Sequence, residues 1–279
     1  MRLNDIYKIA DAFAPKSLSN EYCEKYGAYD NSGILLDAGE EITSVLFSLD
    51  FSLAAIEKAI KQGVNLIVTH HPAIYGGISS IEENAFSPLG KKLNACIKNG
   101  ISVISMHLNL DGAQGGTDES LMQGVYDSAN RVCVQTDGTG TRSTANVVLR
   151  DTLTQGGYGR VYDVPKTTLQ ALQKEMEKEF STKRIQVYGN ADYDITRIAS
   201  FCGGGADESA VEFAVKHGAQ LLISADFKHH VLTLAMEKGL SVLTLTHYAS
   251  ENYGFKKYYE KIRQEIESPC IYHTDEYLL

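Results

Sequence analysis

The sequence has no long hydrophobic run, no excess of basic residues and few cysteines. No apolar stretch approaches the length of a membrane-spanning helix, and the N-terminal segment Met1-Arg-Leu-Asn-Asp-Ile lacks the apolar core of a signal peptide. A net charge of −9 argues against a nucleic-acid-binding surface, which normally carries a basic stripe. The five cysteines include no C-x-x-C pair, which favours free thiols over a disulfide framework. We therefore expect a soluble cytoplasmic protein without nucleic-acid or membrane partners.

The length of 279 residues suits one large domain or two smaller ones, and the patterning is of the α/β type. Residues 3–13 place apolar side chains at helical spacing. Residues 44–50 form an expected strand, and Ser52 is a plausible N-cap for a helix that Gly63 closes. A second strand over 64–69 completes a β-α-β unit, whose two strands run parallel.

Helices and strands are expected to alternate through most of the remaining chain. Residues 73–88 are rich in Gly, Ser and Glu and are expected to form a loop over the site. The further expected elements are helices at 89–98, 118–126, 166–180, 208–216 and 231–236, and strands at 101–106, 145–149, 184–188, 197–201, 221–224 and 240–245.

Two segments of the first half recur in the second half. Residues 59–69 match residues 214–224, and residues 99–106 match residues 238–245. Each copy reads helix, Gly, strand and then polar residues. A repeat with only two copies indicates two related α/β domains rather than a solenoid.

The expected fold is therefore two related α/β domains with a metal site in the cleft between them. After residue 130 the sequence becomes rich in Thr, Gly and Asp, and this change in composition indicates a domain boundary there. We expect a first domain over 1–130, completed by the C-terminal segment 240–279, and a second domain over 131–239.

The strand at 64–69 ends at His70-His71-Pro72. Proline has no backbone N–H to donate, so it ends the strand. The carboxyl ends of parallel strands are where open α/β sheets place their chemistry. Two imidazoles there suit a divalent metal, although a solvated turn carrying two histidines is the alternative.

Other ligand types follow the equivalent strand ends. They are His107 and Asp111 in the first half, and Asp226, His247 and Glu251 in the second. A single polar residue after a strand usually caps the following turn or has its hydrogen bonds satisfied within the protein. This combination of residues instead makes a site for two ions, because a carboxylate has two oxygens and can bridge two metal ions. Nitrogen and oxygen ligands without thiolate indicate zinc, iron, manganese or nickel.

The remaining polar residues receive supporting roles. We predict His107 to be an acid/base in the cleft or a donor behind the ligands. Asp226 and His230 are expected to line or support the site. Gly203-Gly204-Gly205 follows a strand and precedes a helix, so it either cradles an anion or forms a tight packing turn.

With these motifs in view, the sequence resembles the NIF-three-like family of dinuclear-metal-centre hexameric proteins, also called GTP cyclohydrolase I type 2 homologues. The resemblance covers nearly the whole chain. It rests on Asp30-Asn31-Ser-Gly, Leu66-Ile-Val-Thr-His70-His71-Pro72, His107-Leu-Asn-Leu-Asp111, Gly203-Gly204-Gly205, Ser224-Ala-Asp226-Phe-Lys-His-His230 and Thr246-His247-Tyr-Ala-Ser-Glu251.

The resemblance implies metal ligands at the same positions that the residues themselves favour: His70, His71, Asp111, His247 and Glu251. It also implies a toroidal homohexamer with sites facing an internal cavity. The sequence departs from the family at Ala225, where a glycine is frequent, and at the turn Asn31-Ser-Gly-Ile. Neither departure touches a predicted ligand.

Two functions from different classes fit these residues. The first is a metal-dependent hydrolase of a nucleotide-like, phosphorylated or cyclic-amide small molecule. The alternative is a non-enzymatic, ring-forming metal-binding or partner-binding regulatory protein. A cyclohydrolase activity follows only from the family's name, because the sequence carries no feature specific for guanine or pterin.

Overall fold

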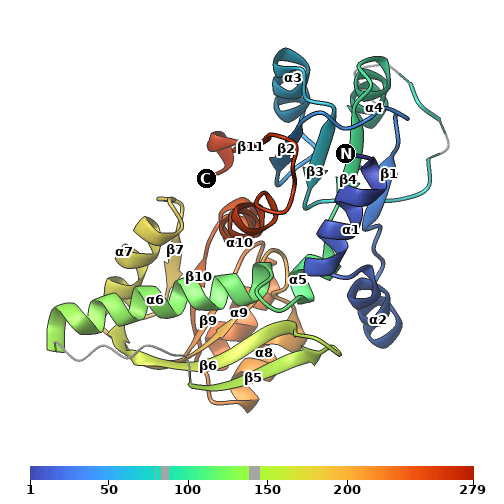
Figure 1. Ribbon diagram of the computed structural model, residues 1–279. Coiled ribbons are helices and arrows are strands. Elements are labelled where there is room, and N and C mark those ends of the chain that lie inside the picture. Colours follow the sequence, from blue (N-terminus) through green and yellow to red (C-terminus); the bar gives the residue numbers. More distant parts are fainter. Residues whose placement is uncertain (79, 83–87, 138–144) are drawn as a thin grey trace. The chain divides into compact units, whose positions relative to one another are not determined.

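The computed structural model describes residues 1–78, 80–82, 88–137 and 145–279 (Figure 1). Contacts between residues divide the chain into two compact units, each of two segments. Unit 1 is Met1–Ala113 with Phe255–Glu276, and unit 2 is Gln114–Gly254 with Tyr277–Leu279. Among the described helices, none combines the length and the apolar character needed to cross a membrane.

Unit 1 is built on a five-stranded sheet with the strand order β1-β4-β3-β2-β11. Strand β1 is antiparallel to β4, and the other neighbours are parallel. The elements are α1 (Leu3–Phe13), α2 (Lys16–Tyr26), β1 (Gly33–Leu36), β2 (Val45–Ser48), α3 (Leu53–Gln62), β3 (Leu66–Thr69), α4 (Pro88–Lys98), β4 (Ser102–Ser105), α5 (Leu108–Gly112), β11 (Cys270–His273) and the second half of α10 (His247–Ile262).

Helix α3 forms where its caps predict it. The Ser52 hydroxyl accepts a hydrogen bond from the Ala55 amide, which satisfies one of the free N–H groups of the first turn. Gly63 ends the helix with a left-handed φ of 66°, a conformation that glycine adopts without steric cost. The chain then enters β3, so the caps fix the start of the strand that leads to His70.

Both faces of the unit 1 sheet are covered. Leu46, Ile67 and Val103 pack in one buried cluster with apolar residues of α3 and α4. On the other face, the ring of Phe47 lies 6.4 Å from that of Phe255 and 5.2 Å from that of Tyr259, both in α10. Because adjacent strand residues point to opposite faces, this double cover explains why the strands are continuously hydrophobic.

Unit 2 contains a six-stranded sheet with the order β5-β6-β8-β9-β10-β7. Strands β8, β9 and β10 are parallel, while β5, β6 and β7 pair antiparallel with their neighbours. The elements are α6 (Thr117–Asp137), β5 (Ala145–Thr152), β6 (Gly157–Thr168), α7 (Leu169–Glu179), β7 (Gln186–Tyr188), β8 (Asp194–Ser200), α8 (Glu208–Lys216), β9 (Leu221–Ser224), α9 (His229–Glu237), β10 (Ser241–Thr244) and the first half of α10; the short 3₁₀ helix η1 (Glu276–Leu278) lies close to the C-terminus.

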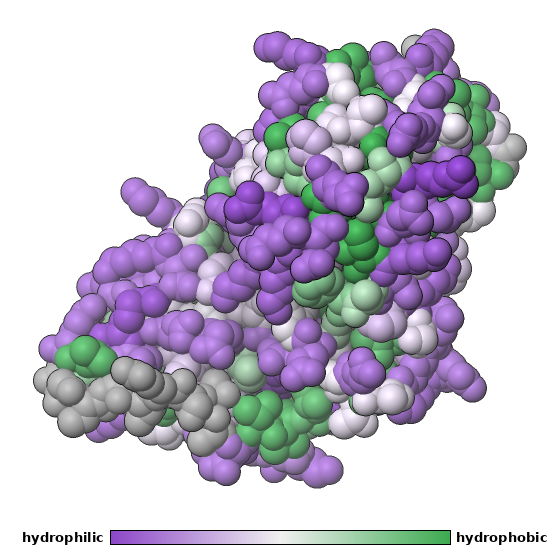
Figure 2. Space-filling model, viewed as in Figure 1, coloured by the Kyte–Doolittle hydropathy of each residue, from purple (hydrophilic) through white to green (hydrophobic). Residues whose placement is uncertain are grey.

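Two buried clusters lie on the two faces of the unit 2 sheet. Leu221, Ile223 and Leu243 pack with α6 and α7, whereas Leu222 and Val242 pack with α8 and α9. On the face drawn in Figure 2, hydrophilic residues cover most of the surface. The hydrophobic residues of the strands therefore pack in the buried clusters of the units.

The two units repeat the same core topology. In unit 1, β2, β3 and β4 are parallel neighbours connected by α3 and α4, and β1 pairs antiparallel with β4. In unit 2, β8, β9 and β10 are connected by α8 and α9, and β7 pairs antiparallel with β10. The predicted α/β class is confirmed, and the matched sequence segments fall on equivalent elements.

The division into units differs from the predicted domains, which were 1–130 with 240–279, and 131–239. Helix α6 belongs to unit 2 because it packs on β6 and α7. Strand β10 also belongs there because it pairs with β9 and β7. The chain returns to unit 1 at Phe255, in the middle of α10.

Several elements were not predicted: helices α2 and α5, strands β6 and β11, and the 3₁₀ helix η1. The expected loop at 73–88 has no helix or strand over residues 73–78 and 80–82, while residues 79 and 83–87 lie outside the described residues. Helix α6 begins as expected but continues well beyond 126.

Candidate metal centre

Unit 1 gathers three imidazoles at the carboxyl edge of its sheet. His70 and His71 directly follow β3, and His107 lies two residues after the end of β4. Strands β3 and β4 are parallel neighbours with Thr69 opposite Ser105. Their carboxyl ends therefore meet at one edge, as the sequence predicts.

The turn after β3 is fixed by its backbone. The amides of His70 and His71 both donate to the Leu49 carbonyl at 3.0 Å. His70 is fully buried, and its Nδ1 lies 2.7 Å from the Met106 carbonyl oxygen. Because a carbonyl oxygen only accepts, Nδ1 must carry the proton and Nε2 keeps its lone pair.

The other two imidazoles of unit 1 have the same orientation. Nδ1 of His71 lies 2.7 Å from Oδ1 of Asp50, and Nδ1 of His107 lies 2.8 Å from Oδ1 of Asp30. An ionised carboxylate only accepts, so both rings also present Nε2 as a lone pair. A carboxylate behind a histidine fixes the ring and raises its basicity, which is the usual arrangement behind metal-binding histidines.

Asp30 is held ionised in a buried position. Burial by itself would raise the pKa of Asp30, but hydrogen bonds from His107, Ser19 and Ser32 outweigh it and hold the pKa well below its usual range. The two hydroxyls donate to Oδ2 at 2.5 and 2.6 Å. Asp30 is therefore a fixed negative charge behind His107.

These side chains can hold a divalent ion. His70, His71 and His107 each offer a nitrogen, and the three nitrogens lie within 4.8 Å of one another. Oδ1 of Asp111, a buried residue of α5, lies 3.4 Å from Nε2 of His70. Imidazole nitrogens with a carboxylate oxygen suit zinc, iron, manganese or nickel better than calcium.

Unit 2 holds a smaller group at the equivalent strand ends. His247 begins α10, and its Nδ1 lies 2.5 Å from Oδ2 of Asp226, which follows β9. Nε2 of His247 lies 3.1 Å from Oε2 of Glu251, one helical turn later and buried. Asp226 adopts a left-handed φ of 51°, a strained conformation that is typical of functional sites.

Gly203 packs directly against this group. A Cβ at this position would collide with Oε1 of Glu251 and lie 3.2 Å from Nε2 of His247. The Gly203 amide donates to the Ser250 hydroxyl at 3.0 Å, and the Cys202 amide donates to Asp118 at 3.0 Å. These partners favour the packing-turn interpretation of the glycine run over an anion cradle.

The structure brings the predicted residues together within each unit. His70, His71 and Asp111 meet in unit 1, and His247, Glu251 and Asp226 meet in unit 2. The joining of the two groups into one centre remains a prediction.

The two predicted supporting histidines lie in different surroundings. His107 lies beside His70 and His71, so its predicted role as an acid/base or a donor stays a prediction. His230 contacts Glu208 at 2.9 Å, and both side chains are exposed, so among the described contacts it is not part of the group around His247.

Sequence reasoning missed the two carboxylates behind His71 and His107. Asp50 was the last residue of the expected strand 44–50, so the rule that polar residues at the carboxyl ends of parallel strands gather at the site would have found it. Asp30 appeared only in a motif of the resemblance, and nothing in its spacing indicated that it would accept from His107.

Comparisons with known proteins agree with this architecture. A family model described as Duf34/NIF3 (NGG1p interacting factor 3) matches residues 1–274. A Clostridium perfringens protein called "GTP cyclohydrolase 1 type 2 homolog" is 30% identical over 270 residues, covering 96% of this chain and 94% of the relative. A Methanocaldococcus jannaschii protein of the same name is 28% identical over 273 residues, covering 97% and 98%.

A solved structure shows the same fold. The Staphylococcus aureus hypothetical protein SA1388 superposes with a TM-score of 0.78 at 22% identity, covering 98% of this chain and 96% of that protein.

Proposed function

Because this chain belongs to the Duf34/NIF3 family, we propose that it is a metal-dependent hydrolase with a centre for two divalent ions. Its substrate is a nucleotide-like, phosphorylated or cyclic-amide small molecule. Curated relatives are called homologues of a GTP cyclohydrolase, a name that fits a substrate of the nucleotide class. The proposed ligands are His70, His71, Asp111, His247 and Glu251.

The observation that carries the proposal is the shared orientation of four imidazoles. Nδ1 of each ring faces an oxygen acceptor: the Met106 carbonyl for His70, and a carboxylate for His71, His107 and His247. In the neutral form of each ring the lone pair therefore lies on Nε2, the atom with which a histidine oriented through Nδ1 binds a metal.

The course of α10 supports the joining of the two groups. The helix carries His247 and Glu251 in unit 2 and continues to Phe255 in unit 1. The ring of Phe255 lies 6.1 Å from that of His70. Glu251 is four residues before Phe255 and so shares its helix face. We propose that this face completes one centre from both units.

Each residue then has a defined task. The carboxylates Asp111 and Glu251 have two oxygens each and suit bridging positions. When bound, a pair of divalent ions supplies Lewis acidity and a water activated at neutral pH. His107 accepts or donates a proton at Nε2, while Asp30 stabilises its charged form by accepting from Nδ1.

Metal content and turnover test this function together. We expect two equivalents of zinc or manganese per chain by elemental analysis, and less in His70→Ala and His247→Ala. His230→Ala, which removes an exposed histidine paired with Glu208, is the matched control and should keep both ions. Hydrolysis of a panel of nucleotides should require the metal and fall to background in His70→Ala.

Full metal content with no turnover on any substrate would reject the hydrolase and favour a regulatory metal protein. Wild-type protein that binds no more metal than the double variant His70→Ala/His247→Ala would reject the centre itself.

The proposed assembly is a homohexameric ring, as the resemblance to the family implies. Sedimentation of the metal-loaded protein should give the mass of six chains of 30.6 kDa. A monomer under the same conditions would reject the ring while leaving the metal ligands untouched.

A further inference from the structure

We propose that Tyr29 and Tyr75 form a stacking platform for a planar aromatic or heteroaromatic ring of the substrate, beside the imidazoles of unit 1. This inference rests on the proposed function, because it assigns part of the ligand that the metal centre would act on. It adds a substrate class: the ligand must carry a flat ring as well as a group that reaches the metal.

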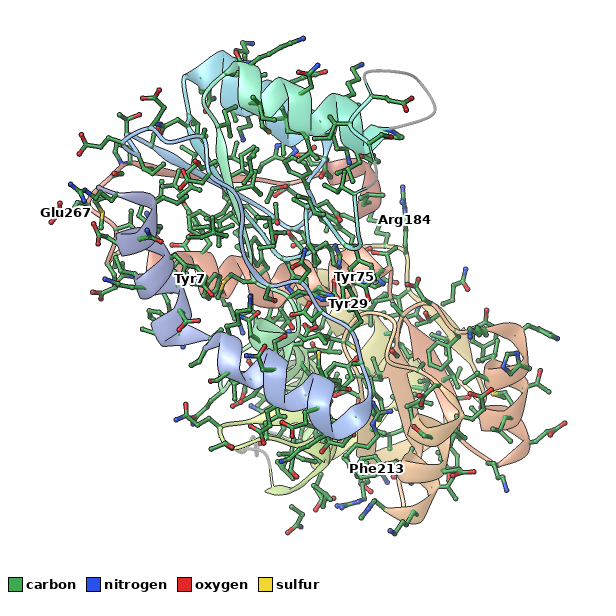
Figure 3. The ribbon with its side chains drawn as sticks, turned by 90° about the vertical axis from the view of Figure 1, so that its right-hand side faces the viewer. Tyr7, Tyr29, Tyr75, Arg184, Phe213 and Glu267 are labelled. Carbon is green, nitrogen blue, oxygen red and sulfur yellow. The ribbon has the colours of Figure 1, made fainter. Side chains whose placement is uncertain are left out.

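Both tyrosines are exposed and lie side by side. The exposed fraction is 55% for Tyr29 and 57% for Tyr75, whereas Tyr126 and Tyr162 are almost fully buried. The two rings are perpendicular, with centroids 5.4 Å apart and an angle of 84° (Figure 3). Figure 3 shows them next to each other on unit 1. An exposed aromatic pair offers apolar faces that a bound ring can cover.

The pair is adjacent to the candidate ligands. The ring of Tyr75 lies 6.3 Å from that of His107, again nearly perpendicular to it. Tyr75 belongs to the segment that follows the His70-His71 turn, and Tyr29 directly precedes Asp30, which accepts from His107. The segments that orient the imidazoles therefore also carry the aromatic rings.

Hydrogen bonds connect the two segments that carry the tyrosines. The Tyr75 hydroxyl donates to the Tyr29 backbone carbonyl at 3.4 Å. The Asn31 side-chain amide, two residues after Tyr29, donates to the carbonyl of Ile74, the residue before Tyr75, at 2.6 Å. Because these contacts keep the two segments together, a ring that stacks on the pair loses less affinity to their ordering.

The chemistry of the pair selects rings rather than chains. Stacking on an aromatic side chain tolerates different bases, because every base has a π face, but it gives nothing to a ligand without a ring. A nucleoside monophosphate has both a ring and an anionic group that a divalent ion attracts. Ribose 5-phosphate has the same sugar and anionic group but no flat base, so the pair of ligands isolates the contribution of the base.

The experiment measures binding of guanosine, adenosine and uridine monophosphates, and of ribose 5-phosphate, to the zinc-loaded full chain by calorimetry. We expect wild type to bind the nucleotides at least fivefold more tightly than ribose 5-phosphate, and Tyr75→Leu to abolish most of that difference. Tyr75→Phe should keep it, because the ring remains. Tyr193→Leu, at an exposed tyrosine of unit 2, is the matched control and should behave as wild type.

Zinc content, measured on every sample, separates this inference from the proposed function. Loss of zinc from wild type would reject the metal centre. Full zinc content with equal binding of nucleotides and ribose 5-phosphate by wild type, or with unchanged nucleotide affinity in Tyr75→Leu, would overturn the platform alone. A change in sedimentation of Tyr75→Leu with unchanged nucleotide affinity would also overturn it and assign the pair to an interface between copies of the chain.

Discussion

Replacing Gly203 by alanine should damage the metal group of unit 2 more than it damages the fold. Gly203 has a left-handed φ of 55°, and an added Cβ would collide with Oε1 of Glu251. Gly218 is the matched control. Its φ is 71°, also left-handed, but a Cβ there would meet nothing within 4 Å. The two variants share the backbone strain and differ in the collision.

The two variants separate the loss of stability caused by backbone strain from the loss of metal affinity caused by the collision. A residue with a Cβ in the left-handed region costs ~1–2 kcal/mol of stability, and both variants should lose about that much. Only Gly203→Ala must also displace the Glu251 carboxylate, which lies 3.1 Å from Nε2 of His247. Disturbing the groups that orient metal ligands costs about 10- to 100-fold in metal affinity.

The assay is competition for zinc between the metal-free protein and a chromophoric chelator, with urea unfolding of the same samples. We expect Gly218→Ala to bind zinc as wild type does, and Gly203→Ala to bind it about 10- to 100-fold more weakly. Equal zinc affinities in the two variants would refute the placement of Glu251 among the ligands.

Three further substitutions test the groups behind the ligands. Asp226→Asn keeps a residue that tolerates the left-handed backbone but removes the carboxylate behind the imidazole of unit 2, so zinc affinity should fall by about 10- to 100-fold; an unchanged zinc titration would contradict this. Asp30 has a folded-state pKa below its unfolded value of about 3.9, so its bond with His107 stabilises the fold above about pH 5 and loses effect as pH falls. Urea unfolding should therefore show a constant stability difference between wild type and Asp30→Asn above about pH 5, which shrinks as the pH falls from about 5 towards 2; a difference that does not shrink in that range would disprove the assignment. Asp118→Ala leaves the buried Arg160 with only the more distant carboxylate of Glu119 at 3.7 Å and should cost ~3–5 kcal/mol in urea unfolding, whereas a cost below ~1 kcal/mol would show that the pair is dispensable.

The candidate ligands were accessible from the sequence because they sit at repeated positions. His70 and His71 follow a strand whose counterpart in the repeat leads to Asp226, and His107 aligns with Thr246, the residue before His247. The end of a strand can be recognised from the local sequence, and the carboxyl ends of parallel strands meet at one edge of the sheet. The candidate metal ligands could therefore be chosen from the sequence before any distance between them was known.

The strand-end rule points to Asp50, but it does not tell which carboxylate lies behind which histidine. Asp50 is separated from His71 by 21 residues, and Asp30 from His107 by 77. No periodicity relates such positions, because the pairing depends on how strands and loops pack. The same limit applies to His107, whose position beside His70 and His71 depends on that packing.

The missed elements have physical reasons as well. Helix α2 buries only Leu18 and Ser19, so its sequence lacks the apolar stripe that indicates a helix. Strand β6 contains Pro165, which usually argues against a strand, but here it falls where the register with β8 shifts. Helix α6 was cut short because the boundary expected at 130 interrupts it.

The most direct test of the central claim is anomalous X-ray diffraction, at the zinc absorption edge, from crystals of the zinc-loaded protein. We expect two adjacent zinc peaks per chain, in contact with Nε2 of His70 and His71 from unit 1 and with His247 and Glu251 from unit 2. A single peak held by unit 1 alone, or peaks away from these side chains, would contradict it.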